Sequence, residues 1–253
     1  MSAMDAAYGI RTEPLPGTPG SELVRSYVWE LPVRVTHWTT FLAIVVLSAT
    51  GYYIHDPYFI VPPRAPFVMG TARFIHVTAG FVLLMSFLVR IYWFFAGNRC
   101  ARLGSFIPTR RWQWRQMWGM FKYYSFLRWR PVMRVGHNPL AGITYMVILG
   151  LILVSILTGL VLFSWTAQTG FLKAAFGWAA GVFGIQNIRL VHFLLMYIFI
   201  AFAIHHVYSA VLVSIEERNG LFESIVTGYK YIPEAELRAD ECAGAPPPKK
   251  RTS

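Results

Sequence analysis

The stretch "RLVHFLLMYIFIAFAIHHVY", residues 189–208, is almost entirely apolar and carries no acidic residue and no lysine. A helix that crosses a bilayer needs about 20 mainly apolar residues, so this stretch predicts a membrane span. It also contains His192, His205 and His206. An imidazole buried among Leu, Ile and Phe costs free energy unless its ring nitrogens have partners. The fold and the function both depend on what these rings bind.

Composition places the whole chain in the membrane class. Of its 253 residues, 55% are hydrophobic and 14% are charged, whereas a soluble domain carries charged residues at about 25%. Aromatic residues reach 16% and include nine Trp, and aromatic side chains gather where a membrane meets water. We therefore expect an integral membrane protein.

Four stretches are long and apolar enough to span a bilayer. They lie at about residues 35–54, 74–95, 140–165 and 190–215. They predict an all-α fold, an integral membrane four-helix bundle, within a domain of residues 27–232. Arg90 interrupts the second span near its end, where its long side chain can snorkel to the interface.

The two ends of the chain are predicted to lie outside this domain. Residues 1–26 have no apolar core, so we expect a cytoplasmic N-terminal extension and not a cleavable signal peptide. Residues 233–253 end in "GAPPPKKRTS", a composition typical of a disordered tail.

The basic charge is concentrated in the loop between the second and third spans. Residues 97–139 hold nine Lys and Arg and no acidic residue, out of a net charge of +11 for the chain. By the positive-inside rule this loop is cytoplasmic, and so are both termini. The charge thus indicates topology and a lipid-facing surface rather than nucleic-acid binding. Its stretch "RRWQWRQMWGMFKYYSFLRW", residues 110–129, predicts one or two interfacial helices or, alternatively, an irregular basic loop.

Alternating passes across the membrane arrange four histidines in two pairs by depth. His76 and His192 are expected at the periplasmic side, and His37 and His206 at the cytoplasmic side. His192 and His206 are 14 residues apart, a rise of about 21 Å that returns to nearly the same helix face. His205 falls on another face, where a packing or hydrogen-bonding role is favoured over its being an alternative ligand.

Bis-imidazole ligation of haem iron suits this arrangement, with the iron held between two helices. Zinc would need further ligands, and the spans hold no acidic residue for that purpose. Cys100 and Cys242 form no metal-ligand spacing, and no C-x-x-C-H motif for covalent haem is present. We also expect no disulfide framework. A haem with both axial positions filled transfers electrons and does not activate oxygen. The alternative for any one histidine is a hydrogen bond to a neighbouring carbonyl.

Arginine precedes three of these histidines in a repeated R-x-x-H pattern. The arginines are Arg34, Arg73 and Arg189. Each lies one turn from its histidine and could pair with a haem propionate, or it could simply mark a membrane boundary. Gly51 and Gly80 could let a flat macrocycle approach the backbone, although glycine is also common in ordinary spans.

The two remaining histidines are given lesser roles. His55, in "HDP" at the outer end of the first span, is expected to be a solvated cap. His137, in "GHNP" before the third span, is expected to be a turn residue, with proton handling as the alternative.

Five stretches, which together cover nearly all of residues 27–232, carry a family resemblance. They are "VRVTHW" (33–38), "RFIHVTAGFVLLMSFLVRIYWFFAGN" (73–98), "GHNPLAG" (136–142), "RLVHFLLMYIFIAFAIHHVY" (189–208) and "GLFESIVTGYKY" (220–231). They resemble the b-type cytochrome subunit of membrane-bound NiFe hydrogenases, in the hydrogenase and formate dehydrogenase cytochrome b superfamily. "RIYWFFAGN" with "GHNPLAG" favours the hydrogenase branch. In one departure, Phe193 stands where relatives often have a second histidine.

The resemblance implies a bacterial inner-membrane anchor with two haem b groups, docked to the small subunit of a NiFe hydrogenase and through it to the large subunit. Electrons from hydrogen oxidation would reach the haem between His76 and His192, then the haem between His37 and His206, and finally a quinone. The basic loop, Tyr229 and residues near His37 are candidates for the quinone site. The complex could form a higher oligomer, and this subunit would have no hydrogen-activating site.

Two rival functions remain open from the sequence. One is the same kind of cytochrome serving a formate or thiosulfate oxidoreductase. The other is a haem-free membrane anchor or transporter that uses its intramembrane histidines for protons or metal ions.

Overall fold

Four long apolar helices form the framework of the protein. The computed structural model describes residues 12–14, 23–57, 67–109, 111–129, 138–166, 170–217 and 220–233. The long helices are α2 (Leu31–His55), α3 (Val68–Ala96), α5 (Pro139–Thr166) and α7 (Ile185–Glu217). Each is long and apolar enough to cross a membrane, so the predicted four-helix membrane bundle is confirmed. The helices extend a few residues beyond the apolar stretches, because backbone hydrogen bonding does not stop where the hydrocarbon ends.

The chain divides into two compact units, and each long helix contributes to both. The bundle unit comprises residues 36–89 and 148–204, and the terminal unit comprises residues 1–35, 90–147 and 205–253. The two ends of the chain and the basic loop therefore belong to the same unit.

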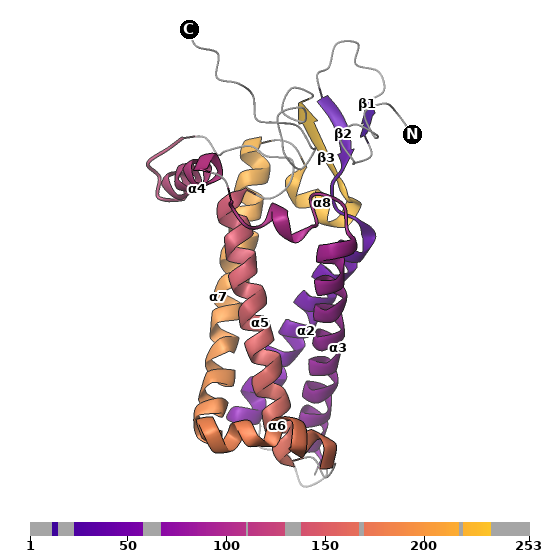
Figure 1. The fold of residues 1–253 in the computed structure, drawn as a ribbon, viewed down its shortest axis with the longest axis vertical. Helices are drawn as coiled ribbons and strands as arrows, with labels where there is room; N and C mark the ends of the chain where they lie inside the picture. The colour runs from indigo at the N-terminus through magenta and orange to yellow at the C-terminus, as the bar shows by residue number, and fades with distance from the viewer. Residues whose placement is uncertain are drawn as a thin grey trace. The chain divides into compact units, whose positions relative to one another are not determined.

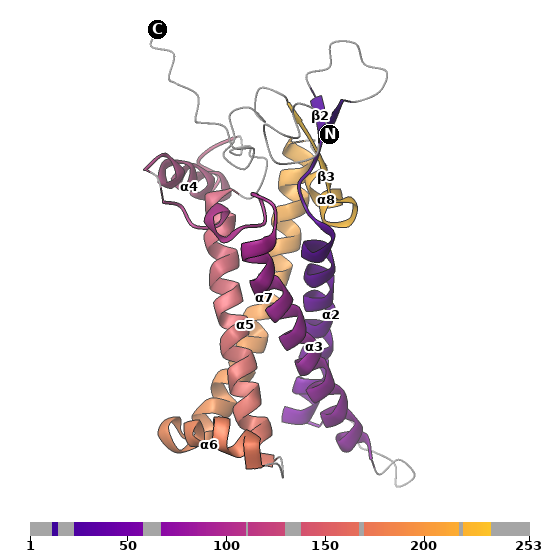
Figure 2. The same ribbon diagram turned by 45° about the vertical axis from the view of Figure 1, so that its right-hand side comes forward.

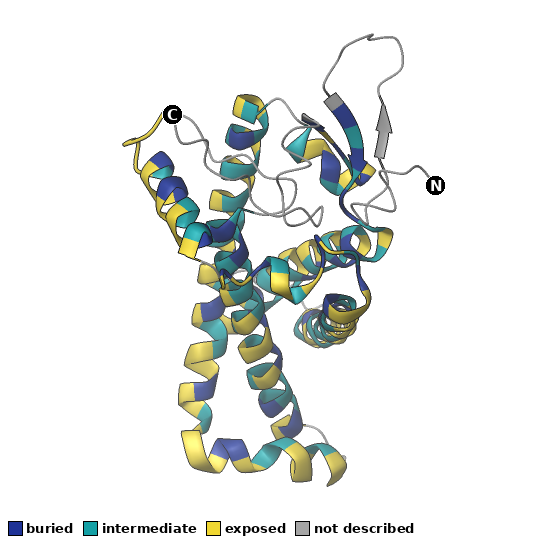
Figure 3. Ribbon diagram, turned by 45° about the horizontal axis from the view of Figure 1, so that its top comes forward, coloured by how far each residue is buried: buried dark blue, intermediate teal, exposed yellow. Residues whose placement is uncertain are grey.

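The bundle unit contains a stretch of all four long helices (Figure 1). Large apolar side chains are exposed along them, among them Phe74, Met85, Leu153 and Ile198, as the exposed faces in Figure 3 illustrate. An apolar surface of this extent is out of place in water and suits a lipid-facing bundle. Polar side chains join α2 to α3 inside it: Thr40 Oγ1 lies 2.9 Å from Ser86 Oγ, and Ser86 donates to the Thr36 carbonyl at 3.1 Å. Small polar residues of this kind commonly link helices within membranes.

A further helix, α6 (Gly170–Phe183), lies between the third and fourth spans. It runs across the end of α5 in both ribbon views (Figures 1 and 2). Ala179 and Ala180 of α6 are buried against Val161 of α5 and Ile188 of α7. These short side chains let the helix backbones approach closely. The turn into α7 is made by Gly184, whose φ of 77° favours glycine.

The terminal unit contains a three-stranded antiparallel sheet, which the all-α prediction omitted. Its strands are β1 (Thr12–Pro14), β2 (Leu23–Tyr27) and β3 (Tyr229–Pro233), in the order β1-β2-β3. Val24 pairs with Ile232 and Ser26 with Lys230, and all four side chains are buried. Alternate residues of a strand share one face, so residues near the two ends of the chain form one small buried layer.

The junction between β2 and α2 is fixed to the end of α3 by hydrogen bonds. Glu30 Oε2 accepts from Trp93 Nε1 at 2.8 Å and from the Asn98 backbone N–H at 2.7 Å. The Asn98 side chain in turn donates to the Val28 carbonyl at 3.0 Å. Trp29 Nε1 donates to Ser224 Oγ in α8 (Leu221–Thr227). These bonds satisfy buried polar groups that would otherwise cost free energy.

The basic loop holds a helix, as one of the two interpretations of its sequence predicts. It contains the short 3-10 helix η1 (Leu103–Ser105) and then α4 (Arg111–Tyr124), where Met120 and Tyr123 are buried against Val213 of α7. Arg90 does not simply extend outward: its guanidinium lies 4.2 Å from the Phe94 ring centre, a cation–π contact.

Two other expectations for the polar parts of the chain have different outcomes. Cys100, fully buried, is disulfide-bonded in the structure, a bond that the sequence did not predict; Cys242 lies outside the described residues. The expected disordered tail and most of the N-terminal extension also lie outside them.

Candidate functional site

The structure brings His76 of α3 and His192 of α7 together in the bundle unit. Their ring centroids lie 6.2 Å apart, with 69° between the ring planes. Both side chains are half-buried among the apolar residues of the bundle. The predicted outer pair of histidines is therefore adjacent in space, although the two residues are 116 positions apart in the sequence.

Each of these rings is hydrogen-bonded to a threonine on the neighbouring helix. Thr50 Oγ1 of α2 lies 2.9 Å from His76 Nδ1, and Thr158 Oγ1 of α5 lies 2.9 Å from His192 Nδ1. Each hydroxyl also donates to a carbonyl of its own helix, that of Val46 at 2.7 Å or Val154 at 2.8 Å. The Nδ1 atom of each imidazole is therefore hydrogen-bonded to a threonine, and Nε2 is not used in these bonds.

A glycine beside each threonine makes room for the ring. A Cβ on Gly51 would lie 3.1 Å from His76 Cε1, and a Cβ on Gly159 would lie 3.2 Å from His192 Cε1. From the sequence, Gly51 could either admit a macrocycle or be an ordinary glycine of a span; in the structure it makes room for the imidazole of His76. Gly80 has no neighbour within 4 Å of such a Cβ, and its role toward a macrocycle stays a prediction.

Thr50, Thr158 and Gly159 were missed by sequence reasoning. The available signal is a repeated Thr-Gly dipeptide, at residues 50–51 and 158–159 in the first and third spans. A threonine in a span ordinarily hydrogen-bonds to its own helix. The dipeptide therefore indicates a contact with a histidine only when the helix that faces it is known.

The separation of the two rings fits a shared metal ion. Imidazole nitrogens bind transition metals at about 2 Å, which places the centroids of two opposed rings about 6 Å apart. The 6.2 Å between the His76 and His192 centroids agrees with this value. Among the described residues, no three His, Cys, Asp or Glu side chains gather to hold a metal ion by themselves. Two imidazoles alone suit a metal whose other ligands come from its own macrocycle, as in haem.

The predicted inner pair is distributed over the two units. His37 belongs to the bundle unit, where its ring lies edge-on to Trp38 at 5.4 Å. His206 belongs to the terminal unit, where its Nδ1 lies 3.4 Å from the Tyr145 hydroxyl. His205 is exposed and lies 6.2 Å from the Tyr124 ring. The pairing of His37 with His206, and the lesser role of His205, stay predictions.

The three arginines of the R-x-x-H pattern differ in their surroundings. Arg34 donates to the Val226 carbonyl at the end of α8. Arg73 and Arg189 are exposed on α3 and α7, one turn before His76 and His192. Their contacts to propionates stay predictions.

The other two histidines also differ from one another. His55 is exposed, as expected of a cap, but its ring also stacks on Phe193 at 3.8 Å and 22°. His137 lies outside the described residues.

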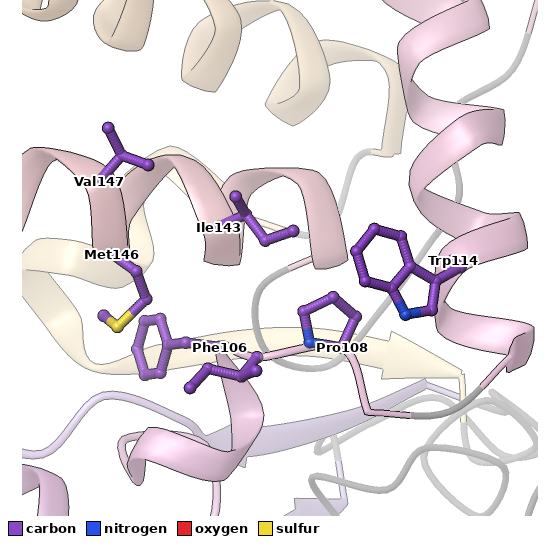
Figure 4. A pocket seen from close by; sticks show the side chains of 7 residues that line it. Phe106, Pro108, Trp114, Ile143, Met146 and Val147 are labelled. Atoms are coloured by element: carbon purple, nitrogen blue, oxygen red, sulfur yellow. The ribbon is translucent and has the colours of Figure 1, made fainter.

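An apolar pocket of about 340 Å³ lies in the terminal unit, between the basic loop and α5. Phe106, Pro108 and Trp114 face Ile143 and Met146 across it (Figure 4). Its full lining is Phe106, Ile107, Pro108, Trp114, Ile143, Met146 and Val147. Tyr229, another residue singled out from the sequence, lies in β3, with the Arg25 guanidinium 3.8 Å above its ring.

Comparison with known proteins gives a consistent result over most of the chain. Residues 28–228 match the model of the family "Prokaryotic cytochrome b561". A "Probable Ni/Fe-hydrogenase B-type cytochrome subunit" from Azotobacter vinelandii is 37% identical over 223 residues, which cover 83% of this chain and 92% of that protein. A protein of the same name from Cupriavidus necator is 38% identical, covering 83% and 89%. The "Probable Ni/Fe-hydrogenase 1 B-type cytochrome subunit" of Escherichia coli K12 is 36% identical, covering 82% and 92%.

Proposed function

Because the chain belongs to the prokaryotic cytochrome b561 family, we propose that it is the membrane-embedded electron-transfer subunit of a NiFe hydrogenase. Family membership makes haem b its cofactor. The observation that carries the proposal is the pair His76 and His192, whose rings lie 6.2 Å apart in a lipid-facing bundle. The names of relatives at about 37% identity support the hydrogenase as the partner.

His76 and His192 are the proposed axial ligands of one haem iron. When bound, haem b supplies reversible one-electron chemistry. With His76 and His192 both holding the iron, the haem would transfer electrons rather than activate oxygen, and the apolar side chains of the bundle would limit the access of water. The residues of this chain therefore hold and insulate an electron carrier.

A second haem b is proposed between His37 and His206. The support is their placement along the spans, with His206 14 residues after His192 on nearly the same face of α7. Two carriers at different depths would let electrons cross most of the bilayer.

The partners follow from this route. We infer that the hydrogenase small subunit, with the large subunit behind it, docks at the periplasmic end of the bundle, and that a quinone binds near the cytoplasmic end. The apolar pocket beside the basic loop supports that side for the quinone, because its lining suits an isoprenoid tail. The nine basic residues of the 97–139 loop support a location in the bacterial inner membrane with both termini in the cytoplasm.

Hydrogen-driven reduction of the purified complex tests the proposal. We expect hydrogen to reduce b-type haem bands in the wild type and quinone to reoxidise them. His192→Ala should abolish reduction by hydrogen, whereas His55→Ala, an exposed histidine of the same unit, should retain it. Bands that respond to formate or thiosulfate but not to hydrogen would assign the chain to another oxidoreductase, and a chain without b-type bands would contradict the proposal entirely.

A further inference from the structure

His76 and His192 lie in matching settings built by two different helix pairs. In the first pair, α2 supplies Thr50 to a histidine of α3, and in the second, α5 supplies Thr158 to a histidine of α7. α2 lies beside α3 and α5 beside α7 (Figures 1 and 2). The two hydrogen bonds have the same length, 2.9 Å, and join the same atoms, Oγ1 and Nδ1. The same contact therefore occurs twice, in two different helix pairs, which argues against a chance contact.

We propose that Thr50 and Thr158 are positioning residues that keep Nδ1 of His76 and His192 protonated, so that Nε2 of each ring is the atom offered to the haem iron. The inference rests on the proposed function, because it assigns a role toward the same haem. It goes further in naming the groups that set the tautomer and the basicity of both ligands.

The hydrogen-bond inventory of the threonines supports this direction. A hydroxyl has one proton, and each threonine points it at a carbonyl of its own helix, at 2.7 Å for Thr50 and 2.8 Å for Thr158. The oxygen lone pairs then face the imidazole and can only accept, so the ring nitrogen donates. The same hydroxyls also lie 3.4 Å from the Leu47 carbonyl and 3.0 Å from the Ser155 carbonyl. A carbonyl only accepts, so each threonine has two acceptors on its own helix for its single proton.

The adjoining glycines fix the same orientation by space. Gly51 and Gly159 lie against Cε1, the atom next to Nδ1, which would be 3.1 and 3.2 Å from a Cβ at those two positions. Rotating either ring by half a turn would put Cδ2 where Nδ1 lies and would break the hydrogen bond to threonine. Each histidine is therefore held by one hydroxyl and one glycine from the neighbouring helix.

A partner that accepts from Nδ1–H makes the imidazole a stronger electron donor to a bound metal. A stronger donor favours ferric over ferrous iron, so these two bonds should lower the potential of the haem. Removing either hydroxyl should raise that potential.

The test compares Thr50→Val and Thr158→Val with Thr50→Ser and Thr158→Ser in the full complex. We expect the Val variants to raise the midpoint potential of one haem and to release haem to apomyoglobin at least about 10-fold faster, because outer partners typically contribute that much to metal affinity. The Ser variants keep the hydroxyl and should stay near the wild type. Thr144→Val, which removes a hydroxyl bonded to the Leu140 carbonyl in α5, is the matched control and should change neither quantity.

Unchanged potential and release rate in both Val variants would overturn the inference, as would Ser variants that shift as far as Val. If the Val variants lose haem altogether, full loading of the Ser variants supports the inference and loss from both overturns it. Failure of the proposed function has a separate signature. If the haem bands survive in both His76→Ala and His192→Ala, these two histidines are not the haem ligands.

Discussion

At the scale of single residues, the closeness of two glycines to two imidazoles is the feature with the most direct consequence. A methyl group on Gly51 or Gly159 would press on a histidine ring at 3.1 or 3.2 Å. Overpacking of this kind typically costs about 1–3 kcal/mol, and here it would act on a ring that we propose as a ligand of the haem iron.

Gly51→Ala and Gly159→Ala are therefore expected to displace the imidazole, lower the haem content of the purified chain and alter the low-spin signal in electron paramagnetic resonance. Gly150→Ala is the control, because a methyl group there meets nothing within 4 Å. Full haem content and an unchanged signal in both test variants would show that the rings have more room than these contacts indicate.

The sequence was sufficient to predict that His76 and His192 meet, because depth along alternating spans restricts which residues can pair. It was insufficient for the threonines. Thr50 and Thr158 are two among several hydroxyl residues in the spans, and their role depends on which helix lies next to which. The pairing of helices is set by side-chain packing across the bundle, and one-dimensional periodicity does not encode it.

At the scale of elements, α6 is held to the bundle by a small apolar cluster. Ile188→Ala should leave a cavity beside Ala179 and Ala180 and cost about 2–5 kcal/mol. The measurement is thermal unfolding in detergent followed by circular dichroism. Ile198→Ala, at an exposed position of the same helix α7, should lower the midpoint much less. Equal effects of the two variants would mean that the cluster contributes little.

The carboxylate of Glu30 joins the start of α2 to the end of α3 within the terminal unit. Glu30→Ala removes the acceptor for Trp93 and for the Asn98 backbone, and unpaired buried donors cost about 1–3 kcal/mol each. Glu30→Gln keeps a side-chain oxygen and should lose less stability. Limited proteolysis near residue 98 should be faster in the Ala variant than in the Gln variant, and equal rates in both and in the wild type would contradict this role.

The elements also show where sequence reasoning ends. The four spans were predictable because lipid demands long apolar helices, and their approximate bounds follow from composition. The sheet was not, because β2 and β3 are five residues each and pair across some 200 positions of sequence. Helix α6 was missed because its 14 residues are too few to span and its loop was assigned no structure.

At the scale of the whole molecule, the distribution of charge predicts the topology. Alkaline phosphatase, which is active only outside the cytoplasm, should be active when fused after Pro57 and inactive when fused after Trp129 or at the C-terminus. The reason is the excess of nine basic residues in the 97–139 loop. The opposite pattern of activity would mean that the topology is inverted, and it would contradict the proposed direction of electron flow.

The most direct test of the account is the haem count of the purified chain and of its histidine variants, read from dithionite-minus-oxidised spectra. We predict two haem b per wild-type chain, the loss of the same one in His76→Ala and His192→Ala, and full content in His55→Ala. A chain that keeps all its haem without His76 or His192 would contradict the claim that these two imidazoles share one iron.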